Sequence, residues 1–234
     1  MLSSQLIALA LAAVTSAHTV ISYPGWRGDN LVTNASFPYG MQWMYPCGGI
    51  PLTHNRTYWP VTGGAIALQP GWFQGHATAQ LFINLGIGDE APDGGPLNMS
   101  LPMVPQFGIL GPSKNPYPGT ICLPQVPMPA NLSLSVGQNV TIQVVELAVH
   151  GAALFSCVDV TLVEPNDPRL NEVNETNCFN STDIGFSDVY TITTRASGQA
   201  QAQGNGTVTS AAVRTLSQVA GWMPVVVGGL WALL

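Results

Sequence analysis

Two runs near the middle of the chain decide the fold: VTIQVVEL at residues 140–147 and ALFSCVDVTLV at residues 153–163. A third run of the same kind, ATAQLFINL, covers residues 77–85. Polar and apolar side chains partly alternate in residues 141–145, as they do in a strand with one buried face. The body of the chain sustains no apolar period of the helical kind. These patterns predict an all-β fold.

Glycine and proline separate the β-like runs; the chain has 25 glycines and 19 prolines. Two proline-rich connections, residues 111–118 and 123–129, are predicted to be long surface loops. The expected architecture is an antiparallel β-sandwich with large loops.

The N-terminal stretch has the pattern of a secretory signal peptide. The apolar run Leu6–Val14 is too short to span a bilayer, and the small residues Thr15, Ser16 and Ala17 follow it. We therefore expect residues 1–17 to be removed by cleavage after Ala17. His18 would then be the first residue of the mature protein.

The C-terminal stretch has the pattern of a glycosylphosphatidylinositol (GPI) anchor signal. A polar spacer rich in small residues, 196–218, precedes an apolar tail, 219–234. The expected attachment site is Asn205, with Ser210 as the second candidate and residues 206–234 as the removed propeptide. The alternative is a tail retained as a membrane anchor, but no basic residues follow it to hold it on a cytoplasmic side.

Glycosylation and disulfide signals also indicate the secretory pathway. The chain has four widely spaced cysteines, which we interpret as two disulfides with three alternative connectivities. No C-x-x-C pair supports a thiolate metal site. The predicted N-glycosylation sites are the sequon residues Asn34, Asn55, Asn98, Asn131, Asn139, Asn174 and Asn180.

Charge is scarce along the chain. Only 8% of the residues are charged, and the formal net charge is -6. No basic patch is present to neutralise phosphates, which excludes a nucleic-acid partner. We expect a binding domain at residues 18–165, followed by a polar segment and stalk at 166–205 that a disulfide ties back.

A histidine at a cleaved N-terminus offers two metal ligands, its α-amine and its ring Nδ1. With a second imidazole opposite, three nitrogens form a T-shaped set that suits Cu(II), which ranks highest among divalent ions in affinity. The α-amine must be deprotonated to bind, and its ordinary pKa near 8 makes this easy at neutral pH. The four histidines are His18, His54, His76 and His150.

A series of motifs spread over residues 18–163 resembles one known family. The motifs are HTV at 18–20, YPGWRG at 23–28, PCGG at 46–49, QPGW at 69–72, GHATA at 75–79, TIQV at 141–144 and HGAALFSCVD at 150–159. Together they are similar to the fungal lytic-polysaccharide-monooxygenase-like copper proteins, also described as the fungal copper-acquisition-factor family.

The resemblance implies an immunoglobulin-like or fibronectin-like β-sandwich with a histidine brace on its edge, binding one copper ion. It also implies copper acquisition or homeostasis at the fungal cell surface, without the oxidative cleavage of true monooxygenases. The implied partners are copper, a surface copper transporter, and the outer leaflet through the GPI lipid.

The resemblance also suggests the copper ligands. His18 is the brace and His76 the second imidazole, just before a strand-like run. The family adds a carboxylate, for which Asp159 is the best match, although it could instead pair with Arg27 or with backbone amides. His150 competes with Asp159 for the third position.

Some residues bear on competing functions. His54, beside a sequon, is expected to be a solvated loop residue. Phe155 could be the axial aromatic residue of a copper monooxygenase, or core. The tryptophans could stack on cell-wall sugars, or simply pack: Trp26, Trp43, Trp59 and Trp72. A third hypothesis is a wall mannoprotein with an incidental histidine.

The disulfides are predicted to be Cys47–Cys157 and Cys122–Cys178. The first would tie the loop around Cys47 to a central strand near the proposed site. The second would hold down the polar segment around Cys178.

Overall fold

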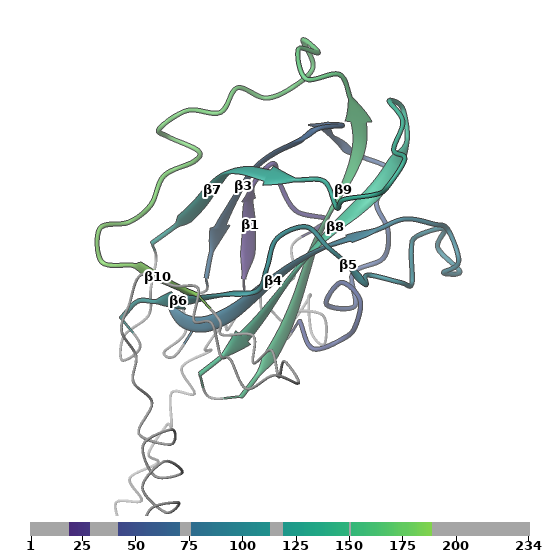
Figure 1. Ribbon diagram of the computed structural model, residues 1–234. Helices are drawn as coiled ribbons and strands as arrows, with labels where there is room; N and C mark the ends of the chain where they lie inside the picture. Colours follow the sequence, from purple (N-terminus) through teal and green to yellow (C-terminus); the bar gives the residue numbers. More distant parts are fainter. Residues whose placement is uncertain (1–18, 29–41, 71–75, 113–118, 150, 189–234) are drawn as a thin grey trace, which may run out of the picture. The chain divides into compact units, whose positions relative to one another are not determined.

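The computed structural model describes residues 19–28, 42–70, 76–112, 119–149 and 151–188, and all structural statements concern these residues (Figure 1). These residues contain ten β-strands, which form two sheets. No helix long and apolar enough to cross a membrane occurs in these segments.

The smaller sheet has three antiparallel strands in the order β1-β3-β7. They are β1 (Val20–Tyr23), β3 (Gly63–Gln69) and β7 (Ile121–Pro127). β3 is buried along nearly its whole length, as a central strand should be.

The larger sheet has the order β10-β6-β4-β8-β9-β2, with β5 also paired to β4. All pairs are antiparallel except β2 with β9, which are parallel. The strands are β2 (Thr57–Pro60), β4 (Thr78–Gly86), β5 (Leu101–Pro102), β6 (Phe107–Leu110), β8 (Asn139–Ala148), β9 (Ala153–Val163) and β10 (Gly185–Asp188).

One hydrophobic core joins the two sheets. Alternate residues of β4 and β8, such as Leu81, Ile83, Ile142 and Val144, are fully buried against β3. The core also contains Ile66 of β3. The all-β sandwich expected from the sequence is thus confirmed, and the three runs quoted above became β4, β8 and β9.

One predicted loop is wrong. Residues 123–129 were expected to be a surface loop, but most of them belong to β7. β7 lies at the edge of its sheet, where a proline is tolerated because its missing N–H would face away from the neighbouring strand. β10 also adds residues 185–188, from the segment expected to be a polar stalk, to the larger sheet.

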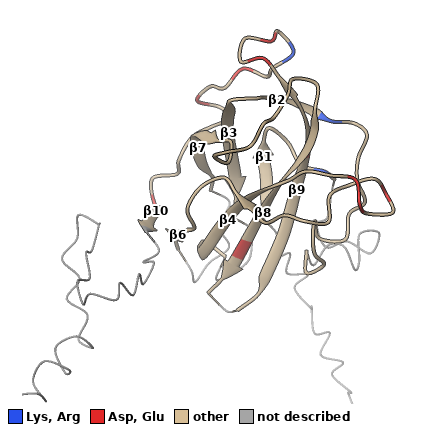
Figure 2. Cartoon of the chain, turned by 45° about the vertical axis from the view of Figure 1, so that its right-hand side comes forward, with Lys and Arg blue, Asp and Glu red and all other residues tan. Residues whose placement is uncertain are grey.

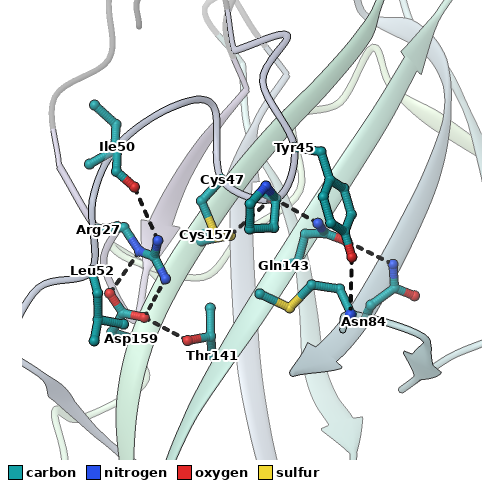
Figure 3. The surroundings of a disulfide bond; sticks show 12 residues. Arg27, Tyr45, Cys47, Ile50, Leu52, Asn84, Thr141, Gln143, Cys157 and Asp159 are labelled. Atoms are coloured by element: carbon teal, nitrogen blue, oxygen red, sulfur yellow. Dashed lines mark hydrogen bonds and ion pairs between the residues drawn. A yellow bond between two sulfur atoms is a disulfide. The ribbon is translucent and has the colours of Figure 1, made fainter. Parts of the chain in front are cut away.

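The two disulfides are Cys47–Cys157 and Cys122–Cys178, the pairing predicted from the sequence. The first fixes residues 42–53, here called the covering loop, to the outer face of β8 and β9 (Figure 3). Gln143 of β8 adds a bond from its Nε2 to the carbonyl of Pro46 at 2.7 Å. The middle of the outer face of β8 and β9, at Thr141, Gln143, Cys157 and Asp159, is therefore buried as well as the inner face.

Candidate metal centre

His76 lies in a turn just before β4, and its side chain is fully buried. Its ring Nδ1 lies 2.7 Å from Oε1 of Glu146 on β8. Ala79 of β4 pairs with Ala148 and Leu81 with Glu146, so the turn before β4 lies at the end of the strand pair that carries Glu146. A metal at His76 would use the other ring nitrogen, Nε2, since Glu146 engages Nδ1.

Glu146 is a buried acid at the end of an apolar strand. It alternates with Ile142 and Val144, so it faces the space between the sheets rather than the covering loop. Burial raises the pKa of Glu146, while its bonds to His76 and Thr19 oppose that shift. Among the described residues, most charged side chains belong to loops (Figure 2), whereas Glu146 is a fully buried carboxylate on a strand, a placement that is costly unless the group is paired.

Thr19 is the third member of the cluster. Its hydroxyl donates to Oε2 of Glu146, while Oε1 faces the His76 ring. Thr19 directly precedes β1, in the smaller sheet, whereas Glu146 belongs to the larger sheet. One buried carboxylate therefore links Thr19, the residue after position 18, to His76 at one end of the sandwich.

Asp159, expected as the third copper ligand, lies elsewhere. Both of its oxygens accept from Arg27, at 2.8 Å each, and Oδ1 also accepts from the hydroxyl of Thr141 (Figure 3). Oδ2 accepts the backbone N–H of Thr53 as well. Thr141, its partner across the strand pair, stands five positions before Glu146 on β8. Asp159 is thus a buried partner of Arg27, the alternative that the sequence left open.

Of the three remaining histidines, the structure describes one. His54 is exposed on a loop, as expected. His18 and His150 lie outside the described residues. Within the described segments, no group of three or more histidine, cysteine, aspartate or glutamate side chains is arranged to hold a metal. His18, the expected brace residue, directly precedes Thr19 in the chain.

The donors around His76 suit copper. Imidazole nitrogen is a ligand that copper prefers. Metal-binding histidines usually donate their other N–H to a carboxylate, which fixes the tautomer and the ring orientation, and Glu146 is placed to accept it. Sequence reasoning missed Glu146, although a lone acid in VTIQVVEL was the signal that could have found it.

Within the described segments, the aromatic residues singled out from the sequence are packed elsewhere or face solvent. Phe155 follows Leu154, which pairs with Glu146, so Phe155 points to the opposite face of β9. There it packs edge-on against Tyr45, with 5.7 Å between the ring centroids. Trp59 is fully buried and Trp26 packs on the core, while Trp43 is 61% exposed; Trp72 lies outside the described residues.

Comparison with known proteins places this arrangement in a family. Residues 16–183 match the domain described as "Copper acquisition factor BIM1-like". The chain belongs to the BIM1-like copper acquisition factor family. The match spans most of the sandwich, including Thr19, His76 and Glu146, and a copper-related function follows for this chain.

Curated relatives of this BIM1-like protein extend along its whole length. It is 64% identical to the "Lytic polysaccharide monooxygenase-like protein ham-7" of Neurospora crassa, over 100% of both chains. It is 59% identical to the "Lytic polysaccharide monooxygenase-like protein X325" of Hypocrea jecorina, over 99% of both chains. A relative of the same name in Aspergillus fumigatus is 56% identical over 83% of this chain and 86% of its own.

Proposed function

We propose that this protein binds one copper ion at the fungal cell surface and serves copper acquisition or homeostasis. The ligands would be the α-amine and ring Nδ1 of His18, as the mature N-terminus, and Nε2 of His76. The observation that carries the proposal is the bridge from Thr19 through Glu146 to His76. It holds the residue next to the proposed brace beside the proposed second imidazole.

Each protein group has a role in this scheme. The buried carboxylate of Glu146 orients the ring of His76 through Nδ1, which leaves Nε2 as the metal-facing nitrogen. When ionised, the carboxylate would also place negative charge close to the bound cation, where burial weakens screening by solvent. Copper would supply its tetragonal preference for nitrogen ligands. His150 stays a candidate for a further ligand, because the described residues do not include it.

Binding without polysaccharide cleavage is the favoured form of this function. Phe155, the candidate for an axial aromatic residue, is turned away from the face that carries Glu146. Copper monooxygenase activity on cell-wall glycan is the second candidate. It is favoured by Trp43, whose side chain is 61% exposed and could stack on a sugar ring.

The proposed location is the outer face of the cell membrane, reached by secretion and a GPI anchor at Asn205. The exposure of predicted glycan acceptors supports the secretory route. All acceptors within the described segments are exposed: Asn55, Asn98, Asn131, Asn139, Asn174 and Asn180. A surface copper transporter would be the protein partner. Release of the protein from intact cells by a phosphatidylinositol-specific phospholipase would test the anchor.

The decisive experiment combines N-terminal sequencing with copper titration. The mature protein should begin at His18 and bind one Cu(II) with a paramagnetic resonance spectrum of nitrogen ligands. His76→Ala, or one extra residue before His18, should abolish tight binding. The matched control is His54→Ala, on an exposed loop. Soluble oxidised sugars released from polysaccharides in the presence of a reductant would favour the monooxygenase instead.

A further inference from the structure

Gln42 is a buried polar residue at the start of the covering loop, and its side chain binds the backbone of Thr19 twice. Its Oε1 accepts the N–H of Thr19 at 2.8 Å, and its Nε2 donates to the carbonyl of Thr19 at 2.9 Å. A neighbouring β-strand offers a residue the same pair of bonds. One side-chain amide therefore extends the hydrogen-bonded frame of β1 by one residue toward the N-terminus.

The backbone of Gln42 is fixed in an uncommon conformation. Its φ is 52°, in the left-handed region that non-glycine residues seldom adopt and that costs free energy. Its carbonyl accepts the N–H of Phe155 on β9 at 2.8 Å. Gln42 is thus anchored to the larger sheet at its backbone, while its side chain holds the residue that precedes the smaller sheet.

We infer that Gln42 is a positioning residue for the copper ligand His18, an inference that rests on the proposed function. The N–H that Gln42 accepts belongs to the peptide unit joining residue 18 to Thr19, and that unit is planar. Fixing the N–H therefore restricts the orientation of the whole plane. The α-amine and ring of His18 both extend from the Cα at the far side of this plane.

The contacts of Thr19 divide the task of positioning between two residues. Its hydroxyl, bound to Glu146, sets where the chain start lies relative to His76. Its backbone, bound to Gln42, sets the direction in which the preceding residue leaves. Neither set of contacts involves a metal ligand atom, so both would restrict the brace independently of copper, which lowers the ordering cost of binding.

Gln143 offers a matched control for this inference. It is also a buried glutamine, and its side chain also binds the covering loop, through the Pro46 carbonyl. The Oε1 of Gln143 accepts from the side chain of Asn84 on β4, so both hydrogen bonds of this side chain go to residues other than Thr19. If Gln42 served only to hold the covering loop, shortening either glutamine would have the same effect on copper.

The test compares Gln42→Asn and Gln143→Asn in the mature protein beginning at His18. Asparagine tolerates left-handed φ, so the first change keeps the backbone and shortens the arm by one methylene. We expect Gln42→Asn to weaken Cu(II) binding roughly 10- to 100-fold, the range for residues that orient metal ligands. Its paramagnetic resonance spectrum should show altered hyperfine splitting. Gln143→Asn should match the parent in both.

The copper affinities of the two glutamine variants distinguish a positioning role of Gln42 from a purely structural one. A folded Gln42→Asn with parental affinity and spectrum, or equal weakening in Gln143→Asn, would overturn the positioning role. The proposed function would still stand if His76→Ala lost copper, and would fall only if His76→Ala bound like the parent. If Gln42→Asn does not fold, the near-isosteric Gln42→Glu replaces it. That variant keeps the acceptor for the Thr19 N–H but loses the donor to its carbonyl, and the same weakening is expected.

Discussion

Nδ1 of His76 lies 2.7 Å from Oε1 of Glu146, and both side chains are completely shielded from solvent. Burying a carboxylate is costly unless it is paired, and the partners of Glu146 among the described residues are His76 and Thr19. Burial of the Glu146 carboxylate costs free energy, and its contact with Nδ1 fixes the orientation of the His76 ring. A contact that served only packing would not need a buried carboxylate.

Replacing Glu146 with glutamine tests this relationship. The amide keeps the shape and an acceptor for the His76 ring but removes the charge, so Cu(II) affinity should fall roughly 10- to 100-fold. Competition titration with a chelator of known affinity measures the change. Glu164→Gln, at an exposed position, controls for the loss of one negative charge. An affinity equal to that of the parent would mean that Glu146 plays no part in binding.

The raised pKa of Glu146 predicts that the free energy of unfolding of the copper-free protein depends on pH. Burial raises this pKa above the ordinary value of 4.5, so the folded state binds the proton more tightly than the unfolded chain does. Its contribution to stability is present below pH 4.5 and is lost as the pH rises through the raised pKa of the folded state.

Urea unfolding of the parent and of Glu146→Gln across this pH range measures the difference in their free energies of unfolding. The parent should lose stability relative to the variant as pH increases. The opposite slope would show that His76 favours the carboxylate more than burial disfavours it.

Asp159→Asn should destabilise the fold and leave the copper site intact. The change removes the charge that Arg27 pairs with in a nearly buried setting, where breaking such a pair costs about 3–5 kcal/mol. Chemical denaturation should show this loss. The copper spectrum of the folded variant should equal the parental spectrum, and a changed spectrum would restore Asp159 as a ligand.

Removing each disulfide separates fold from site. Replacing Cys47 and Cys157 together, or Cys122 and Cys178 together, with alanine should lower the free energy of unfolding by about 2–5 kcal/mol. Only the first pair anchors the covering loop, which begins at Gln42. We therefore expect copper affinity to fall in the first double variant and to stay near the parental value in the second. Equal affinities in folded samples of both would argue against a role for the covering loop.

The sequence was sufficient for the fold class but not for the choice between two buried acids. Asp159 and Glu146 each stand alone in an apolar strand, so composition treats them alike. Which one faces His76 depends on the pairing register of β4 with β8 and on the face of the sheet. The covering loop buries the outer face too, so the alternation that would have distinguished the faces is weak.

Gln42 left no signal in the sequence for a different reason. Its side-chain partner, Thr19, lies 23 residues earlier in the chain, and the two meet where the covering loop, tied to β9 by the disulfide, reaches the start of β1. Its left-handed φ cannot be read from a glutamine, because glycine and asparagine are the usual markers of that conformation. The parallel pairing of β2 with β9 is likewise set by contacts far apart in the chain.

The outer edge of β7 bears on whether copies of this protein can pair edge to edge at high local concentration. An unpaired strand edge is a template on which another chain can add a strand. Here the N–H of Cys122 is taken by the side chain of Asn180, and the carbonyl of Thr120 accepts from Ser181. Two residues beyond Cys122, Pro124 has no N–H to offer. The edge is thus blocked against edge-to-edge aggregation, which suits a protein that would be crowded among its own copies on a surface.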